Sequence, residues 1–178
     1  MQVRPYTSFY YDPQRQGYDT DLWKSITSAP TISSNKLRFN AATAIQYADC
    51  TKGIFEFKMT VPAAPTTGDV RQFGLMSLNR SMYAVFDITD DVFSVKTKDA
   101  LGSTKSTTIT WDSTWTNAAI SFTIQWIGFD VVFKVNNRRM ARHEEKTPTG
   151  PVSAYIKNGN SDNMDMTYLE GKNIEAYV

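Results

Sequence analysis

The sequence predicts an all-β protein, a two-sheet antiparallel β-sandwich, and three observations support this prediction. Apolar and polar side chains alternate with a period of two in the best-patterned segments. Turn-forming residues recur at roughly 8–12-residue spacing, and no stretch of about twelve residues or more sustains a helical period. The chain has 178 residues, of which 41% are hydrophobic, so it is long enough to bury a core without a disulfide or a metal.

Two segments show the alternation most clearly. In residues 53–61 the apolar side chains occupy every second position: Phe55, Phe57, Met59 and Val61. In residues 119–126 they are Ile120, Phe122, Ile124 and Trp126. Strict alternation is typical of a strand with one buried face, so we expect Trp126 in the core.

Shorter β-rich runs, separated by turn residues, complete the predicted sheets. We expect strands at residues 36–39, 71–78, 82–88, 92–97, 106–110, 130–135, 138–143, 152–158 and 165–169. The pair Asn136-Asn137 predicts a two-residue hairpin loop, because asparagine tolerates positive φ.

The chain divides into an N-terminal arm, residues 1–20, and a single β-sandwich domain, residues 21–178. The arm is rich in Tyr, Gln, Asp and Pro and lacks a strand or helix period. Its tyrosines, Tyr6, Tyr10, Tyr11 and Tyr18, are therefore interpreted as interface contacts, either with the chain's own domain or with a neighbouring chain.

Charge and composition argue against several kinds of partner. Lys and Arg total 19 against 18 Asp and Glu, which favours neither nucleic acid nor a membrane as a partner. The N-terminus has no apolar signal segment, and no run approaches the ~18 apolar residues of a membrane span. We expect a soluble protein without a signal peptide that is made in the cytoplasm. Cys50, the only cysteine, is interpreted as a structural thiol, and Arg138, Arg139, Arg142 and His143 as a solvated hairpin face.

Two stretches carry a family resemblance. Residues 53–62 read Gly-Ile-Phe-Glu-Phe-Lys-Met-Thr-Val-Pro, and residues 122–143 run from Phe-Thr-Ile-Gln-Trp through Asn136-Asn137 to Ala-Arg-His. Both resemble the concanavalin A-like lectin/glucanase superfamily, which includes laminarinase-type hydrolases, laminin G-like domains and legume-type lectins. The resemblance covers roughly residues 20–178 and implies a jelly roll of two sheets stacked about 10 Å apart, the concave one often carrying ligand.

The sequence departs from this superfamily at the place where its hydrolases carry out catalysis. Laminarinase-like enzymes carry Glu-x-Asp-x-Glu on one strand, which aims the acid pair at one cleft. The comparable segment here, residues 81–88, contains a single carboxylate, Asp87. We therefore expect no catalytic residues and a protein that is not an enzyme.

Tryptophans and one tyrosine are the candidate ligand-binding residues. Trp111 and Trp115 flank a polar loop, and together with Tyr83 they are predicted to stack on sugar rings. The alternative for the tryptophans is that one of them caps the end of the sandwich core.

No cofactor and no metal are expected. Calcium needs six to eight oxygen ligands, and the two acidic groups, Asp87 with Asp90 and Asp91, and Asp162 with Asn163 and Asp165, are interpreted as turn formers.

These features lead to two hypotheses for function. The first is a structural, assembly or attachment protein on a virion surface, such as a bacteriophage capsid decoration, head-fibre or tail protein. Its partners would be copies of itself or capsid and tail proteins. The alternative is a carbohydrate-binding module or lectin, with a glycan as partner.

Overall fold

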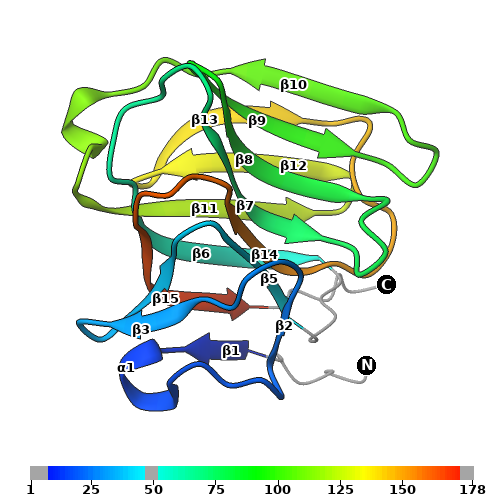
Figure 1. Ribbon diagram of the computed structural model, residues 1–178. Coiled ribbons are helices and arrows are strands. Elements are labelled where there is room, and N and C mark those ends of the chain that lie inside the picture. Colours follow the sequence, from blue (N-terminus) through cyan, green and yellow to red (C-terminus); the bar gives the residue numbers. More distant parts are fainter. Residues whose placement is uncertain (1–7, 47–51, 173–178) are drawn as a thin grey trace.

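The structure, a computed structural model, describes residues 8–46 and 52–172, and these residues form two antiparallel sheets stacked face to face (Figure 1). Helical structure is confined to two single turns, α1 (Pro13–Gln16) and a 3-10 turn, η1 (Ser113–Trp115). The predicted all-β, two-sheet sandwich is confirmed. No helix of the described residues has the length and apolar character needed to cross a membrane.

The first layer is an eight-stranded sheet. Its order is β13 (Arg138–His143), β12 (Asp130–Val135), β11 (Ala119–Ile127), β6 (Gly53–Thr60), β15 (Met164–Lys172), β4 (Lys36–Phe39) and β3 (Thr31–Ser33), and β1 (Ser8–Tyr11) pairs with the C-terminal half of β15. Strands β6 and β15 therefore lie in the middle of this sheet.

The second layer is a seven-stranded sheet. Its order is β10 (Thr104–Thr108), β9 (Val92–Lys98), β8 (Tyr83–Thr89), β7 (Val70–Met76), β14 (Ser153–Asn158), β5 (Ala42–Gln46) and β2 (Trp23–Ser25). Three segments that are far apart in the sequence, residues 70–76, 153–158 and 42–46, lie side by side in its centre.

The core between the sheets is aromatic. Phe73 and Phe86 of the seven-stranded sheet have ring centroids 5.4 Å apart, and Phe122 of the facing sheet approaches Phe73 at 4.8 Å in an edge-on arrangement. Edge-on and offset contacts are the favoured geometries for aromatic pairs. The predicted burial of Trp126 is confirmed, because its side chain is 2% exposed.

The hairpin between β12 and β13 turns at Asn136 and Asn137, as predicted, and both residues have positive φ, 47° and 65°. Positive φ at both central residues lets the turn follow the right-handed twist of its strands. One expectation for this hairpin is wrong. His143 points inward and is fully buried, because it alternates with Arg142, whereas the three arginines of the group are exposed.

Most of the N-terminal segment belongs to the sandwich. β1 extends the eight-stranded sheet, and Tyr11 is buried against Trp23 with ring centroids 5.4 Å apart. Tyr18 shares a 2.5 Å hydrogen bond with Ser25. Tyr10 is 52% exposed and stacks on Tyr168 at 5.7 Å. Tyr6 and Cys50 lie outside the described residues.

Candidate functional site

The outward face of the seven-stranded sheet, the side turned away from the core, carries a mixed set of polar, charged and aromatic side chains. Its positions follow from strand alternation, since Phe73, Phe86 and Ile156 point into the core. One row across the strands consists of Lys24, Ile45, Tyr155, Gly74, Val85 and Lys96. A second row contains Thr43, Lys157, Gln72, Asp87 and Ser94, and a third contains Ser153, Met76, Tyr83 and Lys98.

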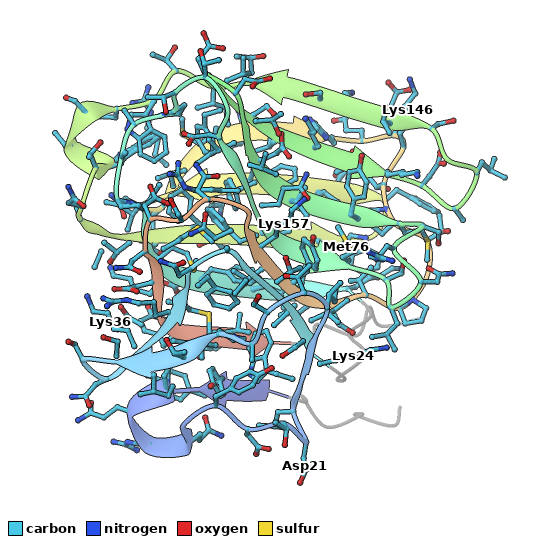
Figure 2. All side chains as sticks on the ribbon, viewed as in Figure 1. Asp21, Lys24, Lys36, Met76, Lys146 and Lys157 are labelled. Atoms are coloured by element: carbon cyan, nitrogen blue, oxygen red, sulfur yellow. The ribbon has the colours of Figure 1, made fainter. Side chains whose placement is uncertain are left out.

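An apolar cluster forms the floor of this face and is separate from the main core. We call it the outer cluster, and its buried members are Ile45, Met76, Val85 and Tyr155, with Ile26 and Tyr83 partly buried against it. Figure 2 shows Met76 on this sheet, together with Lys24 and Lys157. The four central members are at most 6% exposed, so Ile26 and Tyr83 at the edge of the cluster provide its accessible apolar surface.

Gly74 leaves the centre of the floor without a side chain. Its φ is +151°, and a Cβ atom there would lie 2.5 Å from the Ala84 carbonyl oxygen and 2.8 Å from Val85 Cα. The strand therefore accepts only glycine at this position without rearrangement. The same Cβ would also lie 2.9 Å from Ile124 Cδ1 of the facing sheet, and Gly74 itself is buried.

Asp87 is the polar centre of the face. Its carboxylate is 1% exposed and forms an ion pair with Lys96 Nζ at 2.6 Å. It also accepts hydrogen bonds from Gln72 Nε2 and, at 3.0 Å, from Thr89 Oγ1. Three partners compensate the burial of this charge, so Asp87 is held in one orientation.

Two tyrosines border the polar centre as neutral phenols. Burial raises the pKa of Tyr83, and the nearby Lys96 opposes this shift. Burial also raises the pKa of Tyr155, against the effect of Arg80. Both hydroxyls therefore keep their protons at neutral pH and are available as hydrogen-bond donors.

The outward positions of β8 are Tyr83, Val85, Asp87 and Thr89. They share one face because they are two residues apart. Asp87 is the carboxylate among them, so the acid pair that the family resemblance implies for this strand is absent from it.

The predicted tryptophans lie elsewhere. Trp115 is 8% exposed and packs against Phe93 of the main core, and Trp111 contacts Trp115 edge-on at 5.5 Å. Trp111 Nε1 donates to Thr116 Oγ1 at 3.1 Å. The structure does not bring this pair together with Tyr83, which belongs to the outward face.

Sequence reasoning missed Gln72, Lys96, Lys157 and Tyr155 as members of the site. The available signal was the phase of alternation in residues 71–78, 92–97 and 152–158, which assigns each of these residues to the polar side of a predicted strand. The strand order needed to combine them is not visible in the sequence.

The acidic residues near turns have structural partners. Asp162 pairs with the buried Arg71 at 2.5 Å, and Asp165 pairs with Arg38 at 2.8 Å. Asp90 accepts a hydrogen bond from the Gly68 amide at 3.1 Å. Across residues 8–46 and 52–172, no three His, Cys, Asp or Glu side chains gather in a way that would hold a metal ion.

Comparisons with known proteins relate the fold to carbohydrate-active proteins. No family model and no curated protein matches the sequence. Solved structures do match: an apo Crh5 transglycosylase with a TM-score of 0.72 and 15% identity, over 94% of this chain and 85% of that one. A Bacillus licheniformis β-glucanase matches with a TM-score of 0.69 and 12% identity, over 94% of this chain and 98% of the glucanase chain. The Emp47p carbohydrate recognition domain matches with a TM-score of 0.63 and 8% identity, over 93% of this chain and 94% of that domain's chain. The predicted jelly-roll fold is confirmed.

The expectation that the protein is not an enzyme is contradicted by these comparisons. The matching structures include a transglycosylase, a β-glucanase and the laminarinase catalytic domain of Thermotoga maritima. That expectation rested on the carboxylates of one strand. A sheet face gathers groups from all its strands, and here Gln72 and Lys96 of the strands on either side of β8 meet Asp87.

Proposed function

We propose that this protein is a carbohydrate-active domain that binds a glycan on the outward face of the seven-stranded sheet. The observation that carries the proposal is the pairing of an apolar floor, the outer cluster, with a fixed polar centre at Asp87. Sugar rings present C–H groups that pack on aromatic faces, and hydroxyls that bond to carboxylates and amides. On this face the accessible partners are the Tyr83 ring and the Gln72 and Lys96 side chains, which the buried Asp87 holds in place.

Individual residues have distinct roles in this proposal. Tyr83, half-buried at the edge of the outer cluster, offers an aromatic surface and a hydroxyl. Gln72 and Lys96 already bond to Asp87, so they present their remaining donors from fixed positions. The neighbours support the choice of ligand class, since they include a carbohydrate recognition domain and a transglycosylase complex with NAG.

Catalytic turnover of the glycan can be measured in the same experiment as its binding. Tyr83, rather than the buried Asp87, is the group of β8 that a reaction at this face would use. Glycoside hydrolases generally employ a pair of carboxyl groups, and some employ a tyrosine nucleophile. Measuring product release beside binding therefore shows which activity accompanies the site.

The experiment is a glycan-array screen of the wild-type protein, followed by calorimetry and product analysis on the best ligand. We expect Tyr83→Ala to weaken binding by about 5- to 10-fold, corresponding to about 1–1.5 kcal/mol. Trp111→Phe, at a partly buried residue that packs against the main core, serves as the control and should leave affinity unchanged. An array without signal, or equal losses in the two variants, contradicts the proposal.

Assembly into a larger particle, such as a virion surface, is a second candidate role. It is supported by Tyr10, which is 52% exposed and stacked on Tyr168, because exposed aromatic pairs often anchor protein interfaces. Deleting the arm would remove Tyr11 from the core, so Tyr10→Ser is the suitable variant. Light scattering should show an oligomer that this substitution dissociates. A wild-type monomer at all concentrations contradicts the assembly role.

A further inference from the structure

We infer that the glycan bound on the outward face of the seven-stranded sheet is a linear acidic polysaccharide that carries carboxylate or sulfate groups. This inference rests on the proposed function and specifies the ligand of the same site. It follows from the charge of the face, from the lysines that lack acidic partners, and from their spread across the strands of the sheet.

The outward face has a charge imbalance that the whole chain does not have. The chain carries 19 basic and 18 acidic residues. The outward strand positions of this sheet, among the described residues, carry four lysines, Lys24, Lys96, Lys98 and Lys157, and one carboxylate, Asp87. Arg80, from the turn between β7 and β8, adds its charge near Tyr155. A face of one predominant sign attracts ligands of the opposite sign.

Three of the four lysines have no acidic partner among the described residues. Lys96 is neutralised by Asp87. Lys157 lies opposite Thr43 and Gln72 in the sheet register, Lys98 lies opposite Tyr83 and Thr104, and Lys24 lies opposite Ile45. All of these neighbours are uncharged. The three ammonium groups are therefore available to an anionic ligand.

The positions of the lysines favour a chain-like ligand. The three lysines without acidic partners lie in three adjoining rows, and the two farthest apart across the sheet are Lys24 on β2 and Lys98 on β9. Five strand spacings separate these strands, which corresponds to about 24 Å at ~4.8 Å per spacing. That length suits several consecutive sugar units. Lys157 on β14 lies between them in the strand order.

A second basic region lies on the opposite side of the sandwich and is an alternative binding site for an acidic ligand. It is a hollow of about 550 Å³ on the outward face of the eight-stranded sheet, lined by Gln125, Ile127, Asp130, Val132, Lys134, Arg139 and Arg142. Arg142 is already held by Asp130 at 2.5 Å and Glu144 at 3.2 Å. The lining contains no aromatic ring for a sugar to stack on, so we favour the seven-stranded sheet and use the hollow as a control.

The test uses uronic-acid and sulfated hexasaccharides, each compared with its carboxyl-reduced or desulfated form. We expect at least one acidic member to bind at least about tenfold more tightly than its neutral form. Raising the salt from about 0.05 M to about 0.3 M should weaken the acidic ligand and leave a neutral one unchanged. The carboxylate and sulfate series show which anion is preferred. Equal affinity within every pair overturns the acidic-ligand inference but leaves the glycan site standing, whereas an absence of binding by all members overturns both.

Matched double variants locate the binding face. Lys24→Gln with Lys157→Gln removes two charges from the seven-stranded sheet, and Lys134→Gln with Arg139→Gln removes two from the hollow. We expect the first pair to weaken the acidic hexasaccharide about tenfold and the second to change it by less than about twofold. The reverse result places the acidic ligand in the hollow and overturns the inference. The four side chains are exposed or half-buried, and a thermal denaturation curve for each variant confirms that it is folded.

Discussion

Asp87 and Lys96, on neighbouring strands, form an ion pair with a 2.6 Å separation between the carboxylate and Nζ, and the carboxylate is 1% exposed whereas the lysine is 32% exposed. The pair therefore links a buried carboxylate to a partly solvent-exposed ammonium group. Asp87→Asn removes the buried charge, and Lys96→Met removes its partner. We expect each to lower the free energy of unfolding by about 1–3 kcal/mol.

A double-mutant cycle separates the pair from its surroundings. Because the two groups are in contact, the combined variant should lose less than the sum of the single losses, with a coupling of about 1–2 kcal/mol. Urea denaturation of the four proteins provides the values. Additive losses would mean that the contact contributes nothing to stability.

Gly74 is predicted to tolerate no side chain. Gly74→Ala places a methyl group 2.5 Å from a backbone oxygen, so we expect a loss of more than about 2 kcal/mol in the free energy of unfolding. Gly68→Ala is the matched control, since Gly68 also has positive φ, +88°, but has open space around it. A loss of only about 1 kcal/mol is expected for the control. Similar losses for the two variants would argue against a close approach at Gly74.

His143 makes stability depend on pH. The ring joins the two sheets, with Nδ1 2.9 Å from Thr97 Oγ1 and Nε2 3.0 Å from Thr107 Oγ1. Burial, reinforced by Lys105, lowers the pKa of His143 to about 4. The unfolded chain binds its proton near pH 6.5, so between about pH 6.5 and 4 the unfolded state holds more protons than the folded state.

Stability should therefore be fully present above about pH 6.5 and fall as the pH approaches 4, by about 3 kcal/mol through this group. Denaturation midpoints measured at several pH values test the prediction. His143→Gln keeps a polar side chain and cannot titrate, so its profile should be flatter over this range. Parallel profiles for the two proteins would assign the acid sensitivity to other groups.

Arg71 is predicted to be a structural charge. It is 1% exposed and pairs with Asp69 at 2.8 Å and Asp162 at 2.5 Å. Arg71→Met leaves the buried Asp69 without its cation, which should cost about 3–5 kcal/mol. Arg38→Met, at a pair whose arginine is 29% exposed, should cost about 1 kcal/mol or less. Chemical denaturation of both variants makes the comparison, and equal costs would contradict a role for burial.

The sequence allowed much of the fold to be predicted, because the long strands carry an unambiguous period. β6 and β11 alternate over eight and nine residues, and the Asn136-Asn137 turn fixes the hairpin that follows. β1, β2, β3 and β5 were missed. They span only three to five residues, and all except β3, which pairs with the adjacent β4, have pairing partners that are distant in the sequence.

The candidate site could be predicted only in part. The alternation of side chains along a strand places Tyr83 and Asp87 on the same side of β8. The remaining members come together through the order of strands, which places Lys24 beside Ile45 and Ile45 beside Tyr155. The tryptophans illustrate the reverse difficulty. Residue type suggested sugar stacking for Trp115, but tertiary packing buries its ring against Phe93.

Backbone amide chemical-shift mapping with the best acidic hexasaccharide tests the location of the glycan site most directly. We predict that the perturbed amides lie on β2, β5, β14, β7, β8 and β9, with the largest shifts near Lys24, Tyr83, Lys98 and Lys157. The amides of β11 to β13 should remain unchanged. Shifts confined to β11–β13, or to the turn around Trp111 and Trp115, would contradict the glycan site on the seven-stranded sheet.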